Sequence, residues 1–144
     1  MALDFFTLSV IVVAISLILE FAHVRFLKAC HGIDLLFFAP WLFAFKFGFA
    51  NAMTLGFILM AIHIVFNLHM AQFVFLTLPA ILLAIIIGSI LGAAGFYAAL
   101  IVYMIASAAT TTFFGGFGGR FVLFLILGTL FNVGLFSFYQ NLGF

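Results

Sequence analysis

The chain has 144 residues, of which 69% are hydrophobic and 5% are charged, and its formal net charge is +1. A water-soluble domain of this size needs far more polar surface, so the composition excludes a soluble protein and predicts that lipid surrounds the chain. The four Lys and Arg residues are too scattered for the basic stripe of a nucleic-acid-binding protein, and the lone Cys30 excludes an intramolecular disulfide.

The apolar sequence divides into segments of the length that a membrane-spanning helix needs, about 20 residues. The first apolar run has no basic residues before it and no small-residue cleavage pattern after it, so we expect a retained helix there and no secretory signal. Breaks are expected at FNLHMAQ, GSILGAAG and FFGGFGGRF, which are polar or rich in glycine. We therefore predict one all-α transmembrane domain over residues 1–144, with six spanning helices at about 3–22, 33–47, 50–67, 70–90, 93–113 and 121–139.

Two of these segments leave alternatives open. Segment 33–47 is short for a full crossing, so it is either a spanning helix or a re-entrant or strongly tilted one. A broken or re-entrant piece around Pro79 would reduce the number of spanning helices to five.

The distribution of basic residues predicts the orientation in the membrane, because Lys and Arg favour cytoplasmic loops near helix ends. With six spans, the connections after the first, third and fifth helices share one side, and they contain Arg25, Lys28, His69 and Arg120. The first four residues carry only one charged side chain, Asp4. We expect a multi-pass protein of the cell membrane with both termini outside.

The stretch LEFAHVRFLKACHGID holds six of the eleven Asp, Glu, Lys, Arg and His residues of the chain. Glu20 and His23 are three apart at the end of the first helix, and His31 and Asp34 are three apart at the start of the second. Residues at this spacing share a helix face, so a hairpin would gather two carboxylates and two imidazoles, a ligand set suited to a divalent ion such as zinc or manganese. The alternative is a membrane-edge turn whose charges meet the lipid headgroups.

Glu20 is the least expected residue of this stretch. A carboxylate at hydrocarbon depth is costly and needs a partner. The sequence offers His23, Arg25 or Lys46 for that role.

A second group of polar residues lies inside predicted helices. His63 has Asn67 one turn later, and Thr129 and Asn132 form a similar stripe near the end of the chain. Such stripes are expected to point into the bundle, where they either line a cavity for a small polar ligand or a proton, or form hydrogen bonds that join helices.

Small residues recur every four positions at Ala84, Gly88 and Gly92. This pattern lets helix backbones approach closely in lipid. The ridge predicts either packing against neighbouring helices of the same chain or contact with a second copy of the chain.

Motifs of membrane enzymes are absent from the sequence: there is no HExxH, no GxSxG and no P-loop. Glu20 is the only glutamate, so a di-iron carboxylate bundle is excluded as well. We therefore expect a protein that is not an enzyme and has no cofactor, with a divalent metal as the alternative, and any active transport would need a separate energising partner.

Two runs of the sequence resemble the membrane-embedded substrate-binding components of energy-coupling-factor transporters and the related rod-shape protein MreD. They are LTLPAILLAIIIGSILGAAG, where a proline precedes the small-residue ridge, and GGRFVLFLILGTLFNVGLF, where an arginine opens the last helix. The resemblance implies a six-helix bundle that binds a small substrate and works with other membrane subunits.

These observations favour an integral membrane protein that binds a small ligand or ion within its helical bundle, as a subunit of a transport complex. One alternative is a scaffold or assembly subunit without a ligand. The other is a metal-dependent membrane enzyme that uses Glu20, His23, His31 and Asp34. The expected surroundings are the lipid bilayer and other membrane subunits, with no nucleic acid.

Overall fold

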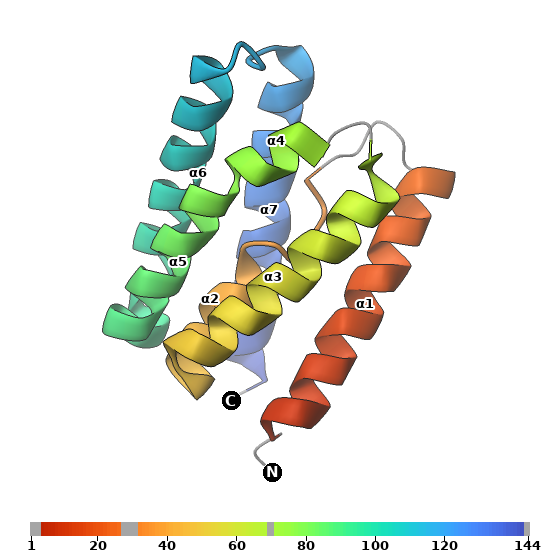
Figure 1. The fold of residues 1–144 in the computed structure, drawn as a ribbon. Helices are drawn as coiled ribbons and strands as arrows, with labels where there is room; N and C mark the ends of the chain where they lie inside the picture. The colour runs from red at the N-terminus through yellow and green to blue at the C-terminus, as the bar shows by residue number, and fades with distance from the viewer. Residues whose placement is uncertain (1–3, 27–31, 69–70, 143–144) are drawn as a thin grey trace.

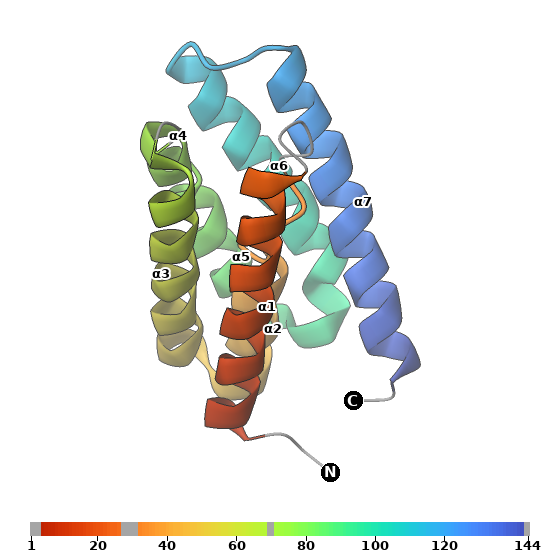
Figure 2. The same ribbon diagram turned by 90° about the vertical axis from the view of Figure 1, so that its right-hand side faces the viewer.

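The structure, a computed structural model, describes residues 4–26, 32–68 and 71–142, and all regular secondary structure within these ranges is helical. The helices pack into a bundle that has both chain termini at the same end (Figures 1 and 2). In chain order they are α1 (Phe5–Arg25), α2 (Phe38–Phe47), α3 (Phe49–Phe66), α4 (Ala71–Leu76), α5 (Leu78–Leu91), the short 3-10 helix η2 (Gly92–Gly95), α6 (Phe96–Phe113) and α7 (Gly119–Asn141).

Four helical stretches of the described chain are long and apolar enough to cross a membrane: Phe5–Arg25, Phe49–Phe66, Val74–Phe113 and Gly119–Asn141. The third is folded back on itself at η2, where Gly92 has φ +59°, so α5 and α6 run side by side in opposite directions (Figure 1). In an apolar 18-residue stretch of α7, only 11% of the residues are buried within the protein. The large apolar side chains that remain exposed match a lipid environment, which confirms a multi-pass helical membrane protein.

Helix α2 differs from the helix that the sequence predicted over 33–47, because it begins only at Phe38. Pro40 explains the late start, since proline lacks an N–H and its ring collides with the carbonyl four residues earlier, so it is tolerated only in the first helical turn. In addition, an oxygen of Asp34 accepts a hydrogen bond from the Leu36 N–H at 3.0 Å, a local turn that competes with a helix. With ten residues, α2 is about 15 Å long, half the thickness of the hydrocarbon layer.

The helix predicted over 70–90 is interrupted at Thr77, between α4 and α5, and Pro79 lies in the first turn of α5. The Thr77 hydroxyl donates to the Val74 carbonyl at 2.7 Å. From α6, the Thr110 hydroxyl lies within hydrogen-bond distance of the Leu76 carbonyl, at 3.0 Å, and of the Ala106 carbonyl of its own helix, at 2.9 Å. Side-chain hydroxyls thus satisfy backbone groups at the break, as a membrane interior requires.

The core of the bundle is built around α2. Trp41 is fully buried, and its ring lies 5.0 Å from that of Phe96 of α6 and 5.7 Å from that of Phe136 of α7, centroid to centroid. Phe96 and Phe136 stack on each other at 3.9 Å. These aromatic contacts join the short helix α2 to α6 and α7.

The small-residue ridge of α5 faces α2. Ala84 is fully buried, and a Cβ added to Gly88 would lie 2.9 Å from the Trp41 carbonyl oxygen and 3.2 Å from the Ala44 Cβ. Gly92 is different, because a Cβ there would meet nothing within 4 Å. Ala84 and Gly88 therefore serve packing within the chain, whereas Gly92 begins the turn to α6.

We expect Gly88→Ala to destabilise the protein by about 1–3 kcal/mol, because the added methyl group must displace the backbone of α2. Gly134→Ala is the matched control. It places the same methyl group on α7 in open space, and it should leave stability unchanged or raise it by up to about 1 kcal/mol. Reversible unfolding in mixed detergent micelles measures both variants, and equal stabilities would contradict the close α2–α5 contact.

Candidate functional site

Helix α1 turns one polar face toward the bundle. Its buried residues are Val12, Ser16, Glu20 and His23, spaced by four, four and three positions along one side of the helix. Glu20, the only glutamate of the chain, is 2% exposed. A carboxylate therefore lies in the interior of a bundle that is otherwise mostly apolar.

Both carboxylate oxygens of Glu20 have partners on α3. Glu20 Oε1 lies 2.5 Å from His63 Nδ1, and the Asn67 side-chain amide donates to Glu20 Oε2 at 2.9 Å. The same amide also donates to the His63 carbonyl at 3.1 Å, which holds the two α3 residues together. Hydrogen bonds to a carboxylate or from an imidazolium are stronger than those between neutral groups, so this contact is a firm link between α1 and α3.

His63 and Asn67 are partners of Glu20 that the sequence analysis did not suggest. Arg25 is exposed at the end of α1, and Lys46 lies over the ring of Tyr139, 5.4 Å from its centroid. The available signal was the spacing: Ser16, Glu20 and His23 form one inward polar stripe, and His63 with Asn67 forms another. The polar side chains of two such stripes in an apolar chain need hydrogen-bond partners, and each stripe can provide partners for the other.

Asp34 adds a second buried carboxyl group. It lies in the irregular segment 32–37 before α2, is 6% exposed, and interacts electrostatically with His63, Glu20 and His23. Two carboxyl groups and two imidazoles thus share the region between α1, α3 and this segment.

The predicted ligand set of His63, Asn67, Thr129 and Asn132 is divided between two places. His63 and Asn67 bind Glu20, whereas Thr129 and Asn132 line a separate pocket together with Asp34 and Tyr103. Asp34 is the residue that takes part in both regions. Tyr103 did not stand out in the sequence, because a single tyrosine in an apolar helix is as well suited to packing.

The predicted metal ligands are only partly visible, since His31 lies outside the described residues. Among the described residues, no group of three or more His, Cys, Asp and Glu side chains is arranged to hold a metal ion. Both oxygens of Glu20 already contact α3 donors, so a metal would have to displace them. A metal site formed by Glu20, His23, His31 and Asp34 stays a prediction.

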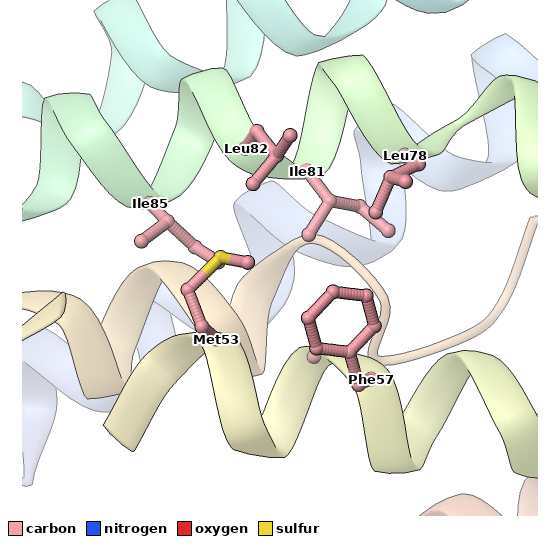
Figure 3. Close-up of a pocket in the computed structure, with 7 residues that line it drawn as sticks. Met53, Phe57, Leu78, Ile81, Leu82 and Ile85 are labelled. Carbon is pink, nitrogen blue, oxygen red and sulfur yellow. The ribbon is translucent and has the colours of Figure 1, made fainter. Parts of the chain in front are cut away.

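A second pocket lies between α3 and α5 and has no polar side chain in its lining. Figure 3 shows Met53 and Phe57 of α3 facing Leu78, Ile81, Leu82 and Ile85 of α5. It offers no side chain that could orient a polar ligand.

Comparison with known proteins identifies no relative: the chain matches no protein-family model, no curated protein and no solved structure.

The contact between Glu20 and His63 can be measured by a double-mutant cycle with Glu20→Leu, His63→Leu and the double variant. Each single change leaves a buried polar group without its partner, whereas the double change removes both groups. We expect a coupling free energy of at least about 1.5 kcal/mol, above the average of about 0.6 kcal/mol for hydrogen bonds between membrane helices.

Unfolding in mixed micelles gives the four stabilities of this cycle. The control cycle combines Glu20→Leu with Asn51→Leu, which removes an amide bonded only to the Phe47 carbonyl of its own chain segment. The control cycle should be additive within about 0.5 kcal/mol. Additivity in the Glu20–His63 cycle as well would rule out the contact.

Proposed function

We propose that this protein is a multi-pass membrane protein that binds and releases a proton at the Glu20–His63 pair, as part of a transport complex. The observation that carries the proposal is the burial of Glu20, which is 2% exposed and bonded through both oxygens to His63 and Asn67. Ionisable residues within the membrane are rare because they are costly, and where they occur as carboxylate and histidine groups they mark ion or proton pathways.

A carboxylate and an imidazole in direct contact suit a proton better than a larger ligand. His63 Nδ1 and Glu20 Oε1 are close enough to share one proton, and histidine is the side chain that most readily changes charge near neutral pH. The nitrogen of the Asn67 amide can only donate to Glu20 Oε2, so it provides a partner for the second carboxylate oxygen. The pair therefore has one group that takes up the proton and one that stabilises the resulting charge.

The proposal includes six crossings of the membrane. The irregular segment 32–37 descends from the end of the bundle at which α1 stops and continues into α2 (Figure 1), so the two together act as one interrupted crossing. The hairpin of α5 and α6 counts as two. An even number agrees with termini at the same end of the bundle (Figure 2).

The sidedness of the proposal follows from the basic residues. Arg25 ends α1 and Arg120 begins α7, and both of these helix ends lie opposite the termini (Figure 1). Lys28 and His69 lie outside the described residues. Because arginine favours the cytoplasmic side, we place both termini outside.

The transport partner remains part of the proposal. The chain has no P-loop, so energy would come from another subunit or from an ion gradient. The resemblance to substrate-binding components of energy-coupling-factor transporters points to the first of these. The scaffold alternative has less support, because Ala84 and Gly88, which it would use to contact another protein, pack against α2 of the same chain.

The topology can be tested with single cysteines in a Cys30→Ser background and a membrane-impermeant maleimide. We expect Phe49→Cys to react from outside, because it lies beyond α2 at the terminal end, and Phe117→Cys to react only from the cytoplasmic side. Both positions are about half exposed. Leu130→Cys, in the middle of α7, should not react from either side. Labelling of positions 49 and 117 from the same side would contradict six crossings.

Proton exchange can be tested by difference infrared spectroscopy of the protein in lipid vesicles between acidic and alkaline buffer. We expect reversible carboxyl and imidazole bands that change together, because protons of a coupled pair belong to the pair. Glu20→Gln should remove the carboxyl component, and the Glu20→Leu/His63→Leu variant should remove both.

Asp4→Asn is the control for this measurement, since Asp4 caps α1 at the membrane edge and is exposed. Its carboxylate accepts the Thr7 N–H, and this hydrogen bond lowers the pKa of Asp4 below its ordinary value. The variant should keep the bands of the buried pair. If the folded wild type shows no such bands, the pair is a structural link and the proposal fails.

A further inference from the structure

The pocket between segment 32–37, α6 and α7 contains a polar centre that the Glu20–His63 pair does not include. Its polar side chains are those of Asp34, Tyr103, Thr129 and Asn132. The pocket measures about 270 Å³ with its open mouth included, and the free space inside it is enough for about one water molecule.

Asn132, one of the residues that line this pocket, has an unsatisfied acceptor. It is 4% exposed, and its side-chain amide nitrogen donates to the Gly128 carbonyl at 2.7 Å. Because a carbonyl can only accept, the nitrogen must be the atom that faces Gly128, and this fixes the orientation of the amide. The other end, Oδ1, is buried and has no hydrogen-bond partner in the described part of the chain. A buried oxygen in this state calls for a donor or a cation.

Asp34 brings a carboxyl group to the same pocket. Its Oδ1 accepts the Leu36 N–H at 3.0 Å, and among the described residues no Lys, Arg or His nitrogen lies within 4 Å of its carboxylate. Glu20, His23 and His63 act on Asp34 electrostatically, and His63 is also in direct contact with Glu20. The charge of a buried carboxylate is costly unless a cation balances it.

Two glycines allow Asp34 and Asn132 to share one pocket. Gly32 has φ +110°, and a Cβ there would lie 2.5 Å from the Phe124 carbonyl oxygen of α7. On α7, a Cβ at Gly128 would lie 3.3 Å from the Gly32 carbonyl oxygen. Segment 32–37 therefore lies directly on the backbone of α7, one turn from Asn132.

The polar side chains that line the pocket carry mostly oxygen atoms, and Asp34 supplies the one carboxyl group among them. Thr129 donates its hydroxyl proton to the Leu125 carbonyl at 2.7 Å or to Met104 Sδ at 3.0 Å, so its oxygen lone pairs remain able to coordinate. Carboxylate, amide carbonyl and hydroxyl oxygens are ligands for hard cations. One carboxylate balances one positive charge, whereas a divalent ion would leave a net charge in a low-dielectric site.

We propose that this pocket binds a small monovalent cation, no larger than a water molecule, between the Asp34 carboxylate and the Asn132 carbonyl oxygen. The Thr129 hydroxyl completes the contact from the same face of α7. The site is separate from the Glu20–His63 pair, so the proposal does not depend on proton exchange at that pair.

Sodium is the probe for this site. The purified full chain, prepared in choline chloride, is unfolded by heat with increasing NaCl at constant ionic strength, and binding of radioactive sodium is measured in the same detergent. We expect saturable sodium binding and a rise in Tm of at least about 3 °C at saturation, because a ligand of the folded state stabilises it. Choline should give no rise.

Variants locate the site. Asp34→Asn and Asn132→Leu should each weaken sodium binding at least tenfold, and Thr129→Val should weaken it less. The matched controls are Asn51→Leu and Thr54→Val, which remove the same kind of bond to the carbonyl four residues earlier, away from the pocket. These controls should bind sodium as the wild type does. The Glu20→Leu/His63→Leu variant should also keep sodium binding, which separates this proposal from proton exchange.

A gain-of-function variant tests the same site even if Asn132→Leu fails to fold. Asn132→Asp places a second carboxylate at the pocket, and we expect calcium to raise its Tm, while calcium leaves the wild type unchanged. The proposal is overturned if sodium and choline give the same Tm without saturable sodium binding, since the pocket then holds water only. It is also overturned if sodium binding persists unchanged in folded Asn132→Leu.

Discussion

The position of α1 depends on one polar contact, the link of Glu20 to His63 and Asn67. In lipid the hydrophobic effect does not draw helices together, because the acyl chains are as apolar as the side chains. In an apolar 18-residue stretch of α1, only 17% of the residues are buried within the protein. The buried face of this helix carries Ser16, Glu20 and His23. The polar contact with α3 therefore helps to determine which side of α1 faces the bundle, together with the packing of the Phe5 ring against Phe43 and Phe47 of α2.

The same constraint explains the centre of the fold. An irregular backbone at membrane depth is tolerated only where protein surrounds it. Segment 32–37 meets that condition, because Asp34, Leu35, Leu36 and Phe37 are all buried. The short α2 that follows is enclosed by the other helices, and the stacked rings of Phe96 and Phe136 cover Trp41. The other helices provide a protein environment in which an interrupted helix with a buried carboxyl group is stable.

Sequence reasoning was most successful where one segment determines its own structure. The apolar runs and their glycine-rich breaks located the helical regions, and the membrane environment followed from composition. The start of α2 was wrong because the prediction for 33–47 gave no weight to Pro40, although a proline belongs in the first turn of a helix. The spacing within each helix indicates the two polar stripes that contain Glu20 and His63, but it does not show that they meet, since 43 residues separate these two side chains. The proximity of Asp34 to Asn132 depends in the same way on the contact between Gly32 and α7.

Asp34 gives the two proposed sites a physical connection. Its carboxyl group interacts electrostatically with Glu20 and His63, and it also lines, together with Asn132, the pocket between segment 32–37, α6 and α7. A proton on the pair and a cation in the pocket are both attracted by this one carboxylate. Binding of either neutralises part of the field that attracts the other, and by linkage the effect is equal in both directions. If both proposals hold, a cation in the pocket and a proton on the pair would each weaken the binding of the other.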